Sequence, residues 1–518
     1  MVDLDDSVDG DQDDGAPLSP PEGTALTSAE RTHVGATTIA RETLASTIAV
    51  GCTVALVYGL TLARSLTWSH WGSDGGDFVT AAVTGRVPHP PGFPVYLALS
   101  RLAVRVFTTT DPAWVLNLLS AVAAGGTALL VAAAARRRGA SVWAAAAAAL
   151  ALAFSPWLWS QALITEVYAT AALLVGLLLW LCEWAQARGG WWWGLVGLGL
   201  GLAVSTHVST IFLVPYIAAR SWRDSPRVLP GLAVGLLPYV VLPLAGPWPQ
   251  PWGDLRSMAG WLHFVSARFY WGNAFGLPAA LWPSRTLAWV VLSLRQFTPV
   301  GALLLMVGAT RVMGGRSNEG AMDARGWHQG IARWLRWVRS EPSAREVLGG
   351  GLSLGLVSLY AIGYDAADSW VYLVAYLPLG ALYVAGGIDA VADSGVPVAA
   401  GLLLPLALVV LNGRALNLAH DQEATVWLER TLLRLPDRAI VLTADDRHTF
   451  ALWYAVDALG RRRDLLVVDE RLLGFEPYDE FLRREGADGA VWDDVDAVGF
   501  AGERPVCAVD VEGEVRCP

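Results

Sequence analysis

The chain has 518 residues, of which 54% are apolar and 16% are charged, and its net charge is −10 with every basic residue an arginine. Because soluble domains are about 25% charged, the composition excludes a purely soluble protein. The acidic balance excludes a nucleic-acid-binding protein, and the apolar content excludes a disordered chain, a coiled coil and a disulfide scaffold. What remains is a polytopic membrane protein with a soluble appendage.

The first 40 residues differ from the rest of the chain. Residues 1–40 are rich in Asp, Ser, Pro and Gly, lack apolar periodicity, and hold seven aspartates within residues 1–14. This composition predicts a disordered acidic tail on the cytoplasmic side. We do not expect a cleavable signal peptide, because the first region of a signal peptide is basic.

Apolar runs of membrane-spanning length recur through residues 41–415. We predict about eleven transmembrane helices. They lie at residues 45–66, 111–135, 141–160, 166–187, 191–206, 208–222, 228–246, 286–312, 346–363, 370–391 and 397–412. His207 and the small polar residues around it predict a break between the fifth and sixth runs. The expected fold class is an α-helical polytopic membrane protein with a small C-terminal α/β domain.

Arginine clusters predict the orientation, because cytoplasmic loops collect positive charge. Three clusters, at residues 136–138, 220–227 and 311–345, fall on the same side of an eleven-span chain. That side and the N-terminus are therefore expected on the cytoplasmic side of a cell membrane. The first outer loop, 67–110, and the chain after residue 412 are expected outside.

Residues 416–518 have the pattern of an extracytoplasmic α/β domain. Two β-like runs alternate with two helical patterns, at 422–435 (helix), 439–443 (strand), 448–460 (helix) and 465–468 (strand). No glycine-rich phosphate motif follows a strand, so nucleotide binding is not predicted. Cys507 and Cys517 flank a predicted hairpin, and the sequence agrees equally with a disulfide and with two free thiols.

The first outer loop carries the most informative residues. Asp74 and Asp77 are three residues apart beside two glycines, a spacing that places both carboxylates on one face of a helix. Two close carboxylates resist joint ionisation, so one gains a raised pKa that suits a general base or a cation site. A surface turn with two solvated aspartates is the structural alternative.

Prolines stiffen the second half of this loop. Four prolines between residues 88 and 94 disfavour helix at the residues before them. We therefore expect residues 87–94 to form an extended loop that holds His89 in place. The pattern of residues 95–107 then predicts an amphipathic helix on the membrane surface.

Two sequence elements of this loop resemble a known superfamily. Asp74-Gly-Gly-Asp-Phe78 and His89-Pro-Pro-Gly-Phe-Pro94, directly after the first span, resemble the GT-C membrane glycosyltransferases. More narrowly, they resemble the protein O-mannosyltransferase-like family, whose elements read Asp-Ser-Gly-Glu-Phe and His-Pro-Pro-Gly-Tyr-Pro. Weaker matches continue to about residue 480, at 154–161, 165–168, 205–207, 252–254 and 364–378. The chain has Asp77 in place of the family's Glu, and Thr206 where the family often has Asn.

The resemblance implies a glycosyltransferase active in protein glycosylation. It would move one sugar, a hexose such as mannose, from a polyprenyl- or dolichyl-phosphate carrier to a hydroxyl of a protein or glycan acceptor on the outer face, with inversion. Asp74 would be the general base, and Asp77 would orient or replace it. No metal is assigned, because a monophosphate donor needs none. A pyrophosphate donor would favour a divalent metal on Asp74, Asp77 and Glu166.

Four further residues are candidates for substrate binding: His89, Glu166, His207 and Arg268. Glu166 is an ionisable residue at a membrane boundary, which makes it a functional candidate. A structural role explains it as well, because a glutamate near the start of a helix stabilises the helix through the helix dipole. His207 is equally consistent with substrate binding and with a packing role. Arg268 would neutralise the departing phosphate, or extend from the membrane surface into water.

A transporter or lipid flippase is the competing function, because intramembrane acids and broken helices serve those proteins too. Such proteins often contain an internal repeat, whereas the acid and proline elements occur once in this chain. A non-catalytic scaffold for envelope assembly is a third interpretation, which requires the two aspartates to be dispensable.

Overall fold

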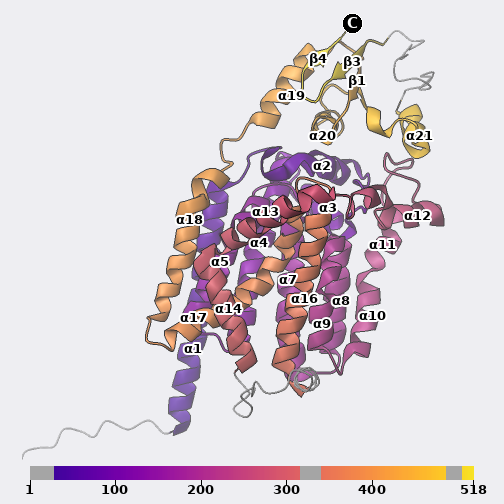
Figure 1. Cartoon of the computed structure of the whole chain (residues 1–518). Coiled ribbons are helices and arrows are strands. Elements are labelled where there is room, and N and C mark those ends of the chain that lie inside the picture. The colour runs from indigo at the N-terminus through magenta and orange to yellow at the C-terminus, as the bar shows by residue number, and fades with distance from the viewer. Residues whose placement is uncertain (1–27, 315–339, 486–503, 518) are drawn as a thin grey trace, which may run out of the picture. The chain divides into compact units, whose positions relative to one another are not determined.

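The computed structural model describes residues 28–314, 340–485 and 504–517. The chain separates into two compact units, Met1–Ala45 and Ser46–Pro518. Within the predicted acidic tail, helix α1 (Ser28–Thr61) begins at Ser28, and residues 1–27 lie outside the described residues. The elements after α1 belong to the second unit, whose helices and small sheet are labelled in Figure 1.

Helices dominate the second unit. In chain order they are α2 (Gly75–Thr84), α3 (Pro94–Val106), α4 (Pro112–Arg137), α5 (Val142–Ala153), α6 (Pro156–Ala162), α7 (Tyr168–Arg188), α8 (Trp192–Thr206), α9 (Val214–Arg220), α10 (Ser225–Gly235), α11 (Leu237–Val241), α12 (Met258–Val265), α13 (Trp282–Gln296), α14 (Thr298–Gly314), α16 (Pro342–Gly363), α17 (Leu377–Ala392) and α18 (Leu403–Leu416). Short 3₁₀ segments connect several of them, including η1 (Ser69–Asp74), η2 (Val208–Leu213), η4 (Arg268–Asn273) and η6 (Ser369–Tyr376).

Among the described residues, seven helical stretches are long and apolar enough to cross a membrane, and up to nine if each bent pair is one span. The seven are Arg41–Thr61, Pro112–Arg137, Tyr168–Arg188, Ser225–Leu244, Pro342–Gly363, Ser369–Ala392 and Val398–Leu416. Trp192–Thr206 and Val208–Arg220 are shorter apolar helices. Together with the bent pairs, these segments match the predicted runs one to one. The predicted fold class is confirmed.

Two of the predicted spans are bent rather than straight. The run at 141–160 breaks between α5 and α6 by 64°, and the run at 286–312 breaks between α13 and α14 by 84°. Pro156 and Pro299 stand in the first turns that follow these breaks, and proline lacks the N–H that would continue the helical hydrogen bonds. The predicted break at His207 is confirmed, because its backbone is extended between α8 and η2.

The C-terminal part forms a small α/β unit around a four-stranded sheet. Its elements are α19 (Glu423–Arg434), β1 (Ile440–Thr443), α20 (Asp446–Trp453), β2 (Leu466–Asp469), α21 (Glu476–Arg484), β3 (Val506–Val509) and β4 (Val515–Arg516). The strand order is β2-β1-β3-β4, with β1 parallel to both neighbours and β3 antiparallel to β4. The predicted strands and helices are present, and Cys507 and Cys517 form a disulfide. The domain limits at residues 41 and 416 stay predictions.

Helix α20 packs directly on α2 (Figure 1). A Cβ added at Gly76 would collide with the carbonyl oxygen of Phe450, so only glycine permits this approach. The Arg86 guanidinium lies 2.5 Å from the Asp457 carboxylate, and the Tyr454 hydroxyl donates to Asp111 at 2.8 Å. The first outer loop and the C-terminal part therefore meet in one packed region.

Candidate functional site

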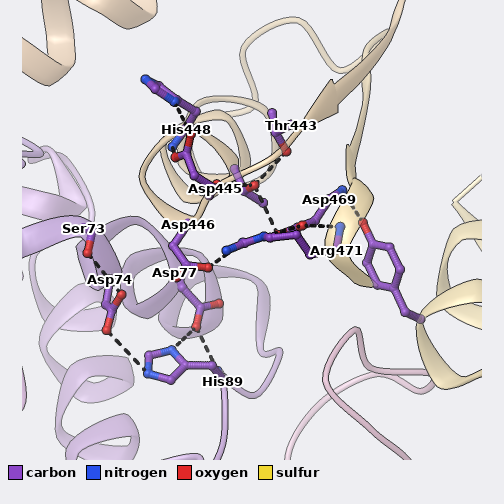
Figure 2. A network of polar contacts seen from close by, with 12 residues as sticks. Ser73, Asp74, Asp77, His89, Thr443, Asp445, Asp446, His448, Asp469 and Arg471 are labelled. Carbon is purple, nitrogen blue, oxygen red and sulfur yellow. Dashed lines mark hydrogen bonds and ion pairs between the residues drawn. The ribbon is translucent and has the colours of Figure 1, made fainter. Parts of the chain in front are cut away.

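The candidate site is centred on the acid–histidine cluster, formed by Asp74, Asp77 and His89. Asp74 ends η1 and Asp77 lies in the first turn of α2, so the start of the helix presents both carboxylates together. One oxygen of Asp77 accepts from the backbone N–H of His89 and contacts its Nδ1, both at 2.8 Å. The His89 Nε2 lies 3.6 Å from the Asp74 carboxylate. Figure 2 shows the imidazole bridging the two acids.

The cluster shifts the pKa values of two of its members. Burial raises the pKa of Asp74 to about 7. The positive charge of His89 acts to lower this pKa, and the negative charge of Asp446 acts to raise it further. Its side chain nevertheless keeps 33% of its surface exposed. Burial by itself would lower the pKa of His89, but Asp74 and Asp77 raise it to about 9. The two carboxylates therefore favour the charged form of His89, and burial favours the protonated form of Asp74.

Aromatic rings from distant elements enclose His89. The ring of Phe450 on α20 is stacked on the imidazole, with centres 6.3 Å apart and planes at 7°. Phe93, Trp252 and Tyr270 contact the same imidazole, with centres 5.1, 6.1 and 6.5 Å away. These neighbours remove water from His89 and hold its ring orientation, so its charge is fixed in space.

Glu166 and His207 lie beyond the cluster on the bundle side. Glu166 is buried just before α7, where desolvation and the charge of Asp74 raise its pKa well above the usual range. The His207 ring is stacked on Phe93, with centres 5.9 Å apart, and Phe93 also contacts His89. Glu166 is thus electrostatically coupled to the cluster, and His207 is connected to it by one intervening ring.

Arg268 is the most peripheral of the predicted residues. It is exposed at the start of η4, and its guanidinium lies 5.9 Å from the centre of the Trp271 ring. Its neighbour Tyr270, not Arg268 itself, contacts His89. The structure therefore brings the η4 segment to the cluster and leaves the arginine at the edge.

Sequence reasoning missed two acids near the cluster. Asp446, in the first turn of α20, raises the pKa of both Asp74 and His89, and it is held by Arg471 at 2.6 Å. Figure 2 shows the contact between Asp446 and Arg471. Asp368 adds to the repulsion at Asp74. Asp446 follows the carboxyl end of the strand predicted at 439–443, which the structure shows to be parallel to both neighbours. Because α/β folds bind ligands at this end of a parallel sheet, its position after a strand could have identified it.

The described residues contain no group of three or more His, Cys, Asp or Glu side chains arranged to hold a metal ion. Within the acid–histidine cluster, the His89 imidazolium already lies between the two carboxylates and supplies the positive charge there.

Comparison with known proteins identifies relatives of the region that carries the site. The family model described as the protein O-mannosyl-transferase TMEM260 N-terminal domain matches residues 74–225. Protein O-mannosyl-transferase TMEM260 of Mus musculus is 31% identical over 251 residues, which are 44% of this chain and 34% of the mouse protein. The protein of the same name from Dictyostelium discoideum is 21% identical over 254 residues, 42% of this chain and 31% of that protein. The chain thus spans about a third of the length of these relatives.

A solved structure gives the fold. The archaeal oligosaccharyltransferase AglB from Archaeoglobus fulgidus, in complex with an inhibitory peptide and a dolichol-phosphate, matches with a TM-score of 0.50 at 14% identity. The match covers 90% of this chain and 69% of AglB. These comparisons agree with the predicted resemblance: the chain is a multi-pass membrane protein with a fold similar to that of AglB, and its residues 74–225 match the model of the TMEM260 protein O-mannosyl-transferase N-terminal domain.

Proposed function

We propose that this protein is a glycosyltransferase that moves one hexose, such as mannose, from a polyprenyl-phosphate carrier to a hydroxyl of a protein or glycan acceptor. The observation that carries the proposal is the acid–histidine cluster, which lies inside the region matched by the mannosyl-transferase family. The named activity of the relatives supports the sugar and the reaction class.

Asp74 is the general base in this proposal. Its pKa of about 7 makes it able to accept a proton at neutral pH, and its exposed third leaves room for an acceptor hydroxyl. As the acceptor oxygen bonds to the anomeric carbon, its proton moves to Asp74 and the bond to the carrier phosphate breaks. A single displacement of this kind inverts the anomeric configuration.

The other predicted residues support this step. Asp77 holds His89 by two contacts, and His89 keeps the Asp74 carboxylate oriented through its facing Nε2. Arg268 would neutralise the departing phosphate. Burial and the charge of His89 lower the pKa of His207 to about 3, so its imidazole is uncharged and would contact the substrate as a hydrogen-bonding group. Glu166 would bind substrate from the bundle side.

We place the reaction on the outer face of a cell membrane. The disulfide between Cys507 and Cys517 supports this side, because disulfides persist in oxidising compartments. The arginine-rich loops at residues 136–138 and 220–227 lie at the other ends of the helices. Because cytoplasmic loops collect positive charge, they support a cytoplasmic location for those ends.

A transfer assay tests the proposal. Membranes containing the full-length protein are incubated with radiolabelled polyprenyl-phosphate mannose, and we expect label to move to protein or glycan. Asp74→Asn should lower turnover about 100-fold or more, the usual effect of losing a general base. The matched control is Asp437→Asn, an acid of the C-terminal part whose side chain is 98% exposed. Near-normal turnover in both Asp74→Asn and Asp77→Asn would refute the base assignment, and label that stays on lipid would favour a transporter.

A further inference from the structure

A pocket of about 560 Å³ lies between the first outer loop and the C-terminal α/β unit. It is lined by Trp68, by one side of α19, by Arg447 and His448 at the start of α20, and by the turn Glu512–Glu514. Its volume falls within the range of about 300–1,000 Å³ that small-molecule sites occupy. None of the three members of the acid–histidine cluster lines it.

Three aromatic rings form a wall of this pocket. Trp427 lies 4.6 Å from His448 and 5.3 Å from Trp68, and Trp68 lies 5.4 Å from His448, measured between ring centres. The Asp445 carboxylate holds the His448 ring at 2.7 Å, as Figure 2 shows. The wall is therefore built before any ligand arrives.

Gly513 allows this wall to form. Its φ of +80° favours glycine, and a Cβ there would press on the rings of both Trp427 and His448. Its carbonyl oxygen accepts from the Trp427 Nε1 at 2.9 Å. The turn between β3 and β4 is thus shaped to admit and orient the indole.

The polar groups of the pocket indicate the charge of its ligand. The Trp68 Nε1 is buried and has no hydrogen-bond partner within residues 28–314, 340–485 and 504–517. An unpaired buried donor is unfavourable, so it points to an acceptor atom on a ligand. At the rim, Arg447 pairs with Glu423, and Arg434 pairs with Glu514 at 3.3 Å. Arg430 and Glu512 also line the pocket, so three arginines face three glutamates. Because these charges neutralise each other, the rim favours a neutral ligand that makes many hydrogen bonds.

We propose that this pocket binds a neutral sugar ring, with the apolar face of the ring against the Trp427 indole and its hydroxyls toward the Trp68 N–H and the rim charges. The face of Trp68 is already covered by the Arg447 guanidinium, 4.1 Å from the ring centre. A phosphate would require an excess of cations, whereas three arginines and three glutamates line the pocket, and a lipid tail would not require a charged rim. A polypeptide strand would need a long free sheet edge, whereas the edge strand β4 has two residues. The proposal is independent of the transfer reaction, because binding needs no donor.

Direct binding of methyl α-mannopyranoside and of a mannose disaccharide tests it. The full-length protein is purified in a detergent without a sugar headgroup, and binding is followed by saturation-transfer NMR of the ligand. We expect saturable binding by the wild type. Trp68→Phe keeps an aromatic ring but removes the unpaired N–H, and it should weaken binding about tenfold.

A second variant separates this pocket from the acid–histidine cluster. Val426 lines the pocket and is 39% exposed, so Val426→Trp fills the space without disturbing the core and should abolish binding. Trp191→Phe, at an exposed tryptophan outside the pocket, is the matched control and should bind as the wild type does. Unchanged thermal unfolding confirms that each variant folds. The proposal is overturned if no sugar binds, if Val426→Trp still binds sugar, or if the pocket takes peptides in preference to sugars.

Discussion

At the scale of single residues, one histidine organises the candidate site. His89 lies between two carboxylates, which raise its pKa to about 9. Burial raises the pKa of Asp74 to about 7. Asp77, one methylene shorter than the family's Glu, uses a single oxygen to hold both the backbone and the ring of His89. The short side chain therefore suits a close positioning role beside Asp74.

The proposed base predicts a pH dependence. Only ionised Asp74 accepts a proton, so kcat/KM should fall tenfold per pH unit below about pH 7. Asp446→Asn removes a like charge and lowers the pKa of Asp74, so the fall of kcat/KM at low pH, the acid limb of the pH profile, should move to lower pH. The limb is measured by transfer assays between pH 5 and 9. If the fall of kcat/KM at low pH stays in place, or moves to higher pH, in Asp446→Asn, this electrostatic account is contradicted. Asp437→Asn, whose side chain is 98% exposed, is the control.

At the scale of elements, close backbone contact joins α2 to α20. Gly76 meets the backbone of Phe450, whose ring stacks on His89, so one glycine controls both the approach of the helices and the enclosure of the imidazole. The C-terminal part is thus expected to matter for catalysis through its position.

Gly76→Ala should separate these helices. The added methyl collides with rigid backbone, and such overpacking costs about 1–3 kcal/mol of stability, with a parallel loss of transfer activity. Thermal unfolding and the transfer assay measure the two effects. Gly351→Ala, in α16 with open space around the new methyl, should be neutral or slightly stabilising. Equal behaviour of the two variants would argue against the contact.

Four other helices are joined by a buried ion network. Arg138 at the end of α4 and Arg220 of α9 both pair with Glu346 of α16, and Arg220 also contacts Glu183 of α7 at 2.8 Å. All four side chains are at most 14% exposed. The network fixes the ends of these helices relative to one another.

Removing one partner from this network should be costly. Glu346→Gln leaves two buried guanidinium groups undercompensated, and breaking a buried pair costs about 3–5 kcal/mol. The exposed pair Arg311–Asp393 supplies the control, since Asp393→Asn should cost at most about 1 kcal/mol. Thermal unfolding in detergent compares the two, and a loss in Glu346→Gln no larger than in the control would contradict the expectation.

At the scale of the whole molecule, α4 separates the two charged regions of the protein. Asp111, at its start, contacts Tyr454 of the C-terminal part, and Arg138, at its end, enters the ion network. Its 26 residues give a length of roughly 39 Å, which exceeds the hydrocarbon core of a bilayer. The candidate site and the arginine-rich helix ends are therefore expected on opposite sides of the membrane.

Labelling of single cysteines checks this arrangement. In a background with Cys52→Ser and Cys182→Ser, the two remaining cysteines form a disulfide and should not react. An impermeant maleimide should label Thr109→Cys in intact cells, and should label Arg223→Cys only after the membrane is opened. The reverse pattern would place Asp74 inside the cell and would refute the proposed reaction on the outer face.

Much of the fold could be predicted from local patterns. Apolar runs predicted the membrane helices, two β-like runs between helical patterns predicted β1 and β2, and small polar neighbours predicted the break at His207. The acid pair and His89 were identified together because they lie within one short loop. The bends at Pro156 and Pro299 were missed, because the apolar pattern continues through them and hides the interruption in hydrogen bonding.

The sequence by itself determined the helices, the family motif and the acids at its centre. Each membrane helix satisfies its own backbone hydrogen bonds, so length and apolarity suffice to specify it. Only the tertiary structure brought Asp446 and Phe450 to His89, paired Arg138 with Glu346, and built the pocket between Trp68 and Trp427. These contacts join residues hundreds of positions apart, and their geometry depends on how helices pack, which no local pattern records.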